Sequence, residues 1–317
     1  MNSRKHIILG TGVLGLGVAH RLAGLGLGLD PLLVSRRGGQ AGGWPVQACD
    51  ATDPVALAAL LDGPTTLYVC AAPPYWRWER EFPALADGIA RAVAGREVDI
   101  VLADNVYAYG PCAGAFHEGD PARPCSRKGQ VRQAVAERLM AMHGHGGVRV
   151  AVVRGATFFG PGVEQSSVGQ GAFLSALGGK PTYVIGDPHT AQAFTYVPDF
   201  AAAMVAVARG EHGYGQCWHA PSHSGASQFA FLDTVAGLGQ HPVRVRAVGP
   251  TMMRCLGLFN PALRELVEML YLYDTSWAFS SDLTERTFGL ASTPLKTAIA
   301  HTAASVRAAL QAPLPVA

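Results

Sequence analysis

Hydrophobic positions in the first half of the chain follow two patterns that alternate along the sequence. Short apolar runs, ended by glycine, proline or polar residues, predict buried strands, and segments with apolar residues at helical spacing predict helices between them. The apolar runs predict six strands, at 6–9, 31–35, 46–50, 66–71, 99–103 and 148–154. The helical segments lie at 13–25, from residue 54 onward, at 81–94 and at 128–142.

This alternation predicts the fold class. Strands joined by helices pair in parallel, so we expect an α/β fold with a doubly wound parallel sheet. Beyond residue 162 the alternation loosens into short strands at 182–186, 194–197 and 217–220 and a helix to residue 208, which Asp199 is expected to cap. The remainder is expected to be mostly helical and comprises 227–238, 243–248, 250–258, 261–271 and 294–310.

The first strand runs into glycines spaced G-x-G-x-x-G at a turn from strand to helix. Gly10 permits the tight turn, Gly12 lets the backbone approach phosphate groups, and Gly15 allows the helix to pack closely on the strand. The start of the helix supplies free N–H groups and the positive end of its dipole. The sequence therefore predicts a dinucleotide pyrophosphate site formed by Gly10, Gly12, Val13, Leu14 and Gly15.

The end of the second strand bears on which cofactor is bound. An acidic residue there binds the ribose 2′-hydroxyl of NAD, whereas arginine accommodates the 2′-phosphate of NADP. Ser35, Arg36 and Arg37 occupy this point with no carboxylate beside them, which favours NADP over NAD, although these residues also suit a solvated basic turn. Asp50, at the tip of the third strand, is placed either to accept a hydrogen bond from the adenine amine or to cap the helix starting at Pro54.

Together, these features divide the chain into two parts. We expect a Rossmann domain that binds NAD(P) over residues 1–165, to which the segment 194–220 returns. Residues 166–193 and 221–317 are expected to form a smaller, mostly helical C-terminal lobe that binds the substrate.

The chemistry is expected at the end of the fifth strand. The polar, tyrosine-rich segment 104–111 follows this buried strand, and its side chains would emerge at the carboxyl edge of the sheet, over the nicotinamide. The loop 72–76 contains aromatic residues that either line a substrate pocket or fill the packing of the loop. We further expect cofactor contacts at Ala71, the last residue of the fourth strand, and at Phe158, which follows the sixth strand.

Composition and charge limit the partners. The formal net charge is +2 and no basic run is present, so nucleic acid is not expected as a partner. No apolar run reaches the ~18 residues of a spanning helix, so no membrane partner is expected. His143 and His145 lack a third ligand nearby, so no metal site is expected.

The six cysteines are scattered and include no C-x-x-C pair. This pattern favours a reducing compartment, and we expect a cytoplasmic protein. The basic pair Arg4-Lys5 and the apolar run to Ala19 superficially resemble a secretory signal. However, four glycines interrupt that run and no cleavage-site pattern follows it, so a nucleotide-binding turn is the better interpretation.

Several stretches in this order resemble the extended short-chain dehydrogenase/reductase superfamily, of the NAD-dependent epimerase/dehydratase type. The matching stretches are 10–15, Asp50, 106–110, 154–162 and 196–199. The resemblance implies an NAD(P)-dependent Rossmann domain with a small C-terminal substrate lobe. It also implies a homodimer as a possible assembly, because the helices at 81–94 and 128–142 often form a four-helix bundle between subunits in resembling proteins.

The chain departs from that family where the chemistry is expected. The family uses a Ser or Thr after the fifth strand and a Tyr-x-x-x-Lys on the next helix, whose tyrosine is the acid or base and whose lysine tunes it and holds the ribose. Asn105 occupies the Ser/Thr position, and Lys128 and Arg132 occupy the Tyr and Lys positions. The resemblance therefore implies an atypical member that lacks the usual Tyr-x-x-x-Lys.

Two routes for the proton remain open from the sequence. Lys128 could donate it if its surroundings depress its pKa, or Tyr107 or Tyr109 could supply a phenol that Lys128 tunes. Arg132 stays protonated and could hold the ribose or a phosphate. The candidate catalytic residues are thus Asn105, Tyr107, Tyr109, Lys128 and Arg132, and Lys128 is also a candidate cofactor contact.

These observations favour one function and leave one alternative. We expect an NADP-dependent oxidoreductase or epimerase/dehydratase-like enzyme that acts by hydride transfer on a small organic substrate, with an atypical proton donor. The alternative is an NADP-binding protein with a sensing or non-redox role, which the missing Tyr-x-x-x-Lys would allow.

Overall fold

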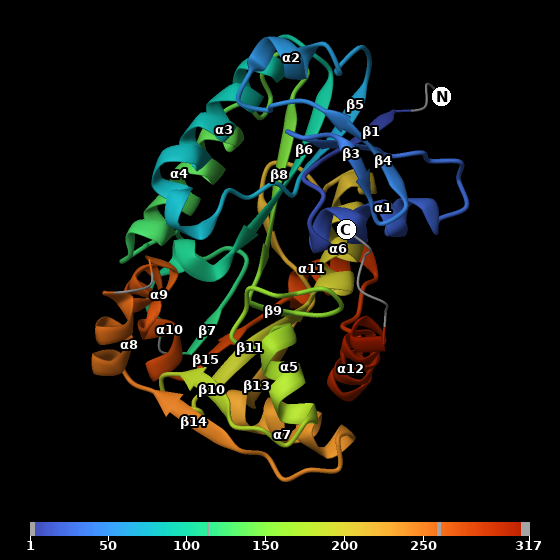
Figure 1. Ribbon diagram of the computed structural model, residues 1–317. Helices are drawn as coiled ribbons and strands as arrows, with labels where there is room; N and C mark the ends of the chain where they lie inside the picture. The colour runs from blue at the N-terminus through green and yellow to red at the C-terminus, as the bar shows by residue number, and fades with distance from the viewer. Residues whose placement is uncertain (1–3, 113, 259–260, 312–317) are drawn as a thin grey trace.

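An eight-stranded sheet forms the centre of the molecule (Figure 1). The computed structural model describes residues 4–112, 114–258 and 261–311. The strands of this sheet are β1 (Lys5–Leu9), β2 (Leu32–Ser35), β3 (Gly39–Ala41), β4 (Trp44–Ala48), β5 (Thr65–Val69), β6 (Val98–Asn105), β8 (Arg149–Gly155) and β12 (Cys217–His219). Their order is β12-β8-β6-β5-β1-β2-β4-β3.

All neighbours from β12 to β4 pair in parallel, and only the edge strand β3 is antiparallel to its neighbour. The chain order reverses at β1, which has β2 on one side and β5 on the other. The chain connections on the two sides of β1 therefore run in opposite directions. This arrangement opens a crevice beyond the carboxyl ends of these strands. The predicted doubly wound Rossmann sheet is confirmed. The short hairpin strand β3 was not predicted.

Helices cover both faces of the sheet (Figure 1). One face carries α2 (Pro54–Ala58), α3 (Trp78–Val93) and α4 (Arg127–Met140), and the other carries α1 (Val13–Ala23) and α6 (Val197–Arg209). Side chains alternate along each strand between these two layers, since Ile7 packs with the α3 and α4 side and Ile8 with the α1 and α6 side. Strands buried on both faces explain why the apolar runs in the sequence are continuous.

A second lobe packs beyond the carboxyl edge of the sheet. Its core joins α5 (Gln170–Leu177), α7 (Gln228–Leu238) and α12 (Leu295–Gln311) around buried aromatic residues. The lobe also has a parallel pair, β10 (Thr182–Ile185) with β14 (Val245–Val248), and a three-stranded sheet of β13 (His223–Ser227), β11 (Ala191–Tyr196) and β9 (Thr157–Phe159). It thus contains more strand than the sequence indicated, because segments distant in the chain supply the pairing partners.

The remaining elements lie between the two lobes and along their edge. They are η1 (Tyr75–Arg77), η2 (Val106–Tyr109), β7 (Gly114–Phe116), α8 (Pro250–Gly257), α9 (Pro261–Leu266), η3 (Val267–Met269), α10 (Tyr271–Asp274), β15 (Trp277–Phe279) and α11 (Asp282–Phe288). Strands β7 and β15 pair in parallel, and α9 lies against η1. Among the residues described, no helix combines the length and apolar composition that crossing a bilayer requires.

Asp199 corrects one expectation about the helix α6. Its carboxylate accepts hydrogen bonds from the backbone N–H (2.8 Å) and the hydroxyl (2.7 Å) of Thr293. Residue Tyr196 is the N-cap of α6, without a side-chain hydrogen bond. The prediction that Asp199 caps its helix was therefore wrong, since the carboxylate holds the segment before α12 instead.

Candidate active site

The glycine turn between β1 and α1 has the geometry that the sequence predicted. Gly10 has a φ of +103°, and a Cβ there would lie 2.6 Å from the backbone nitrogen of Ala71. A Cβ on Gly15 would collide with the carbonyl oxygen of Gly10. At Gly12 a Cβ would meet nothing within 4 Å, so the backbone here borders open space. No side chain caps this end of α1, which leaves its first N–H groups, including those of Val13 and Leu14, free for phosphate oxygens.

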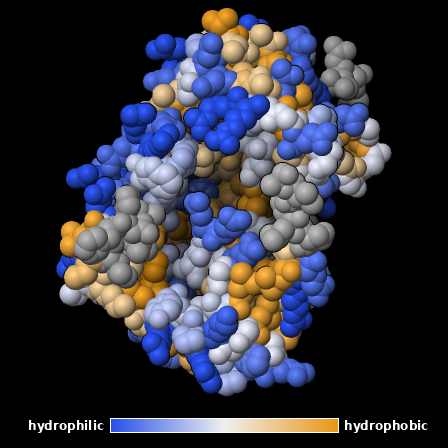
Figure 2. Space-filling model, viewed as in Figure 1, coloured by the Kyte–Doolittle hydropathy of each residue, from blue (hydrophilic) through white to orange (hydrophobic). Residues whose placement is uncertain are grey.

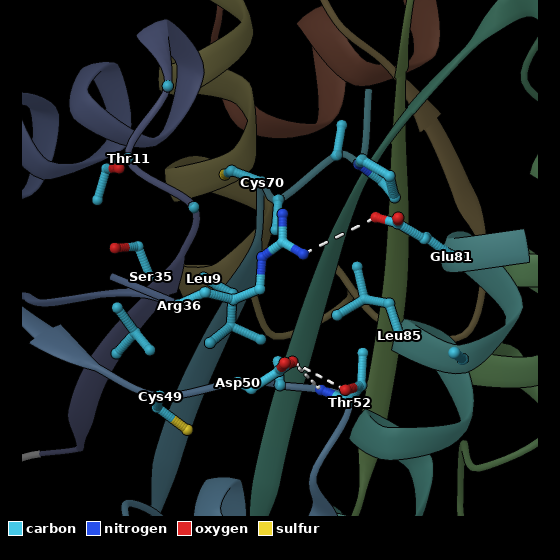
Figure 3. A pocket seen from close by; sticks show the side chains of 18 of the residues that line it. Leu9, Thr11, Ser35, Arg36, Cys49, Asp50, Thr52, Cys70, Glu81 and Leu85 are labelled. Carbon is cyan, nitrogen blue, oxygen red and sulfur yellow. Dashed lines mark hydrogen bonds and ion pairs between the residues drawn. The ribbon is translucent and has the colours of Figure 1, made fainter. Parts of the chain in front are cut away.

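A cavity of about 700 Å³ opens beside this turn and is called the adenosine cavity below. It lies at the carboxyl ends of β1, β2, β4 and β5, and α3 closes it (Figure 3). Of the predicted cofactor contacts, it brings together Gly10, Gly12, Ser35, Arg36, Asp50 and Ala71.

The side chain of Arg36 extends into this cavity. Its side chain leaves the end of β2 and points across the cavity toward Glu81 on α3 (Figure 3). The two groups form an ion pair at 3.8 Å, and Arg77 also contacts Glu81, at 3.2 Å. Arg37 is exposed and does not line the cavity. Of the two arginines at the end of β2, Arg36 is thus the one available to a cofactor, and Arg80 on α3 adds a second guanidinium at the cavity wall.

Asp50 lies on the opposite side of the cavity from the glycine turn. One of its oxygens accepts hydrogen bonds from the backbone N–H (3.0 Å) and hydroxyl (2.8 Å) of Thr52. The helix α2 is capped by Asp53, whose carboxylate accepts from Val55 and Ala56. Since Asp53 takes the capping role, the carboxylate of Asp50 remains at the cavity wall, where adenine is expected.

A second cavity, of about 460 Å³, lies between the Rossmann sheet and the second lobe and is called the substrate cavity below. Figure 2 shows this face of the molecule hollowed between the two lobes. The wall of the substrate cavity includes three predicted site residues, Asn105 at the end of β6, Tyr107 in η2 and Phe158 in β9. The loop after β5 adds Tyr75 and Trp76, so the aromatic residues of that loop do line a pocket.

Two tyrosines, Tyr75 and Tyr107, line this cavity. Burial raises the pKa of both Tyr75 and Tyr107, so both phenols are protonated at neutral pH. Among the described residues, the buried hydroxyl of Tyr75 has no hydrogen-bond partner. Asn105 turns its amide oxygen to the backbone N–H of Tyr107, at 3.2 Å, and thereby fixes the start of η2.

Tyr109 lies outside both cavities. Its hydroxyl donates to Nε2 of His219 at 2.6 Å, and Nδ1 of His219 donates to the carbonyl oxygen of Ser280, also at 2.6 Å. Burial lowers the pKa of His219 to about 3, so the ring is neutral. Tyr109 therefore connects the sheet to the segment before α11.

Lys128 is buried at the first turn of α4, with 1% of its surface exposed. Its Nζ lies 2.5 Å from a carboxylate oxygen of Glu265 on α9 and 5.1 Å from the centre of the Tyr75 ring. It lines neither cavity. The ammonium group is thus behind the tyrosine wall, paired with a carboxylate.

Arg132 is part of a buried ion cluster. Its Nε lies 2.6 Å from Asp104, whose other oxygen lies 2.8 Å from Nε of Arg154. Although burial acts in the opposite direction, the two guanidinium groups hold the pKa of Asp104 below its usual value. Arg132 also packs on the rings of Trp78 and Phe82, and it lines neither cavity.

Several residues at the cavities were not among the predicted site residues. Glu81 and Arg80 come from the first turns of α3, and Ser166, Ser167 and Tyr273 come from the second lobe. Tyr75 had a signal in the sequence, as an aromatic residue in the loop after a buried strand. The lobe residues had none, because their approach to the sheet depends on packing between distant segments.

The described residues contain no group of three or more His, Cys, Asp or Glu side chains that could hold a metal ion. His143 instead accepts a hydrogen bond at Nδ1 from the backbone N–H of Val150. All six cysteines are free thiols.

Solved structures with the same fold are numerous. The UDP-glucuronic acid 4-epimerase from Bacillus cereus, in complex with NAD, is 14% identical with a TM-score of 0.76, covering 98% of this chain and 99% of that one. MoeE5, in complex with UDP-glucose and NAD, is 19% identical with a TM-score of 0.73, covering 96% and 99%. The dTDP-glucose 4,6-dehydratase from Bacillus anthracis str. Ames, in complex with NAD, is 12% identical with a TM-score of 0.76, covering 98% of both chains.

At this level of identity, these structures establish the fold alone. No curated protein sequence matches the chain. The sequence profile of the NAD dependent epimerase/dehydratase family matches residues 7–215, a range that includes the glycine turn and the strands that carry both cavities. The chain therefore belongs to the NAD dependent epimerase/dehydratase family, within the extended short-chain dehydrogenase/reductases.

Proposed function

We propose that the chain is an NADP-dependent oxidoreductase that acts by hydride transfer on a small organic substrate. One observation carries this proposal: the two cavities share the loop 70–76 and together follow the carboxyl edge of the sheet from β4 to β8. An extended dinucleotide would lie along this edge, with adenosine at β1, β2 and β4 and nicotinamide near β5 and β6. A bound nicotinamide cofactor supplies or accepts the hydride.

The residues around the adenosine cavity support NADP as the cofactor. Arg36 is the cation that faces this cavity from the end of β2, and the neighbouring side chains, Ser35 and Arg37, include no carboxylate. A ribose 2′-phosphate would replace Glu81 as the partner of Arg36. NAD, which is present in the similar structures, remains the second choice.

We propose Tyr107 as the acid that serves the substrate oxygen. Its phenol lines the substrate cavity and is protonated at neutral pH. In the direction of reduction, the phenol O–H proton passes to the carbonyl oxygen while the carbonyl carbon gains the hydride, and the phenolate is reprotonated from water. Tyr75, whose hydroxyl has no partner among the described residues, would donate a second hydrogen bond to the same oxygen.

Lys128 and Arg132 then act as positioning residues. The ammonium group of Lys128 lies behind the ring of Tyr75 and joins α4 to α9 through Glu265. Arg132 holds the end of β6 through Asp104, directly before Asn105. We also propose the division into a Rossmann domain of residues 1–165 with 194–220 and a substrate lobe of 166–193 with 221–317. A homodimer remains a further prediction.

The similar protein MoeE5 is found in complex with UDP-glucose and with UDP-glucuronic acid. Substrates of that kind are one candidate class for this chain, and uncharged carbonyl compounds are another. An epimerase or dehydratase reaction would use the same hydride step, with the substrate reoxidised before release.

The test combines cofactor binding with turnover. We expect the purified chain to bind NADPH and to oxidise it with members of a panel of ketones, aldehydes and nucleotide sugars. Tyr107→Phe should lower kcat by about a hundredfold or more while NADPH binding changes little. The matched control is Tyr109→Phe, which lies outside the cavities and should retain kcat within about tenfold.

Two outcomes would contradict this proposal. If NADPH binds but no panel member is reduced, the sensing or non-redox alternative is favoured. If Tyr107→Phe leaves kcat unchanged with a substrate that is turned over, Tyr107 is not the acid.

A further inference from the structure

The substrate cavity is almost free of charged side chains. Among the residues that the structure describes, its lining includes one charged residue, Glu164, which is exposed, and no lysine, arginine or histidine. From this we propose that the physiological substrate is an uncharged carbonyl or alcohol compound with an aromatic or apolar portion, and that nucleotide diphosphate sugars are excluded. This inference rests on the proposed function for the identity of the cavity and specifies its substrate class.

Three buried cations on elements around the cavity are already paired with carboxylates. Lys128 is 1% exposed and lies 2.5 Å from Glu265. Arg132 and Arg154 share Asp104 and are both buried. Moving any of these groups to an incoming phosphate would leave a carboxylate without its partner, which is strongly unfavourable for a buried pair.

Arg264 is a further cation near this cavity. It lies on α9, two residues before the lining residue Leu266, but its side chain is 67% exposed and is not part of the lining. Its Nε is 4.0 Å from Glu265. It therefore faces water, where its charge is screened.

A diphosphate in this cavity would lack compensation for its charge. Burying an unpaired anion is unfavourable because it loses its hydration and gains no cation. The carboxylate of Glu164 would add repulsion. The cavity wall favours the opposite kind of ligand, since the rings of Tyr75, Tyr107, Phe158 and Tyr273 offer apolar faces.

The polar groups of the cavity are neutral and few. Asn105, Thr157, Ser166 and Ser167 offer amide and hydroxyl groups. The hydroxyls of Ser167 and Tyr75 have no partner within the part of the chain that the structure describes. Such groups suit the oxygen of a carbonyl or alcohol, which needs one or two hydrogen bonds and no counter-charge.

The experiment compares probes that differ in charge. Isothermal titration is carried out on the complex with oxidised NADP, which cannot reduce the probes, using 4-phenyl-2-butanone, phenylpyruvate and UDP-glucose. The first two are an aromatic ketone and an aromatic keto acid of similar size. We expect the uncharged ketone to bind at least about tenfold more tightly than either charged probe, a difference of about 1.4 kcal/mol.

A substitution that adds a cation to the cavity wall tests whether the lack of positive charge there causes the preference for an uncharged ligand. Ser166→Arg places a guanidinium at the cavity wall and should strengthen phenylpyruvate binding about tenfold, with less effect on the ketone. Ala304→Arg adds the same charge on the exposed side of α12 and should leave all three affinities unchanged. This control separates a local contact from the effect of net charge.

The results separate this inference from the proposed function. If NADPH itself does not bind, the proposed function fails. If NADPH binds but UDP-glucose or phenylpyruvate binds as tightly as the ketone, or if the ketone does not bind, the substrate class proposed here is wrong. An unchanged preference for the ketone in Ser166→Arg would also overturn it.

Discussion

The guanidinium of Arg36 reaches across the adenosine cavity to the carboxylate of Glu81, 3.8 Å away. The two residues belong to different elements, one at the end of β2 and the other in the first turns of α3. Arg36 is 62% exposed and Glu81 is 19% exposed, so the arginine can exchange this partner for a phosphate. Two predictions about the choice of cofactor follow from this ion pair.

The first prediction concerns the arginine itself. Arg36→Ala should weaken NADPH binding about ten- to a hundredfold, because a hydrogen bond between charged groups contributes about 1.5–3 kcal/mol. NADH, which has no 2′-phosphate, should bind as before. Cofactor titrations of the wild type and of both Arg36→Ala and Arg37→Ala check this. Equal affinity of the wild type for NADPH and NADH would contradict the assignment of the 2′-phosphate to Arg36.

The second prediction concerns the carboxylate. Glu81→Gln removes the competing negative charge near the expected 2′-phosphate, so NADPH should bind about threefold to tenfold more tightly. Glu79→Gln, on the same helix but 51% exposed and 3.9 Å from Arg127, is the matched control. A loss of NADPH affinity in Glu81→Gln would show that Glu81 supports the cofactor by orienting Arg36.

The third prediction concerns the different roles of two glycines in the same turn. A Cβ on Gly12 meets nothing within 4 Å, whereas a Cβ on Gly15 collides with the carbonyl oxygen of Gly10. Gly12→Ala should therefore change the free energy of unfolding by about 1 kcal/mol or less but weaken cofactor binding strongly. Gly15→Ala should lower the free energy of unfolding by about 1–3 kcal/mol. Denaturant unfolding and NADPH titration distinguish the two effects, and equal losses of stability would count against this division of roles.

The fourth prediction concerns the dependence of stability on pH. Burial lowers the pKa of His219 to about 3, below its value near 6.5 in an unfolded chain. Between these values the unfolded chain binds more protons, so this group's contribution to stability is complete above about pH 6.5 and is lost as the pH falls toward 3. The full effect is about 5 kcal/mol.

The variant His219→Gln tests whether His219 is the source of this pH dependence. The glutamine amide has an acceptor for the hydroxyl of Tyr109 and a donor for the carbonyl of Ser280, but it does not titrate in this range. Urea unfolding between pH 4 and 7 should show a shallower pH dependence in the variant than in the wild type. The same slope in both proteins would assign the effect to other groups.

The fifth prediction concerns the ion cluster at the end of β6. Asp104→Asn leaves the buried guanidinium groups of Arg132 and Arg154 without their carboxylate and should lower the free energy of unfolding by about 3–5 kcal/mol. Asp87→Asn is the control, because Asp87 is 51% exposed in its pair with Arg138 and should cost less than about 1 kcal/mol. A small loss in Asp104→Asn would mean that the cluster does not hold this strand end.

Much of the fold was predictable because its signals are local. The apolar runs of β1, β5, β6 and β8 are continuous because both faces of the sheet are covered, and their alternation with helices dictates parallel pairing. The glycine turn was predictable for the same reason, since each glycine acts on neighbouring backbone. Strands β13 and β15 were missed, because their partners lie far away in the sequence.

The sequence by itself determined the family fold and the glycine turn between β1 and α1, and it predicts a pyrophosphate site at this turn and the loss of the usual Tyr-x-x-x-Lys. Only the tertiary structure separated the roles of the candidate catalytic residues that were predicted in place of this motif. Tyr109 meets His219 across 110 residues, and Lys128 meets Glu265 across 137, which leaves Tyr107 as the predicted catalytic tyrosine at the substrate cavity. A side chain's chemistry depends on the charges and hydrogen bonds around it, and here those come from segments that meet only when the second lobe packs on the sheet.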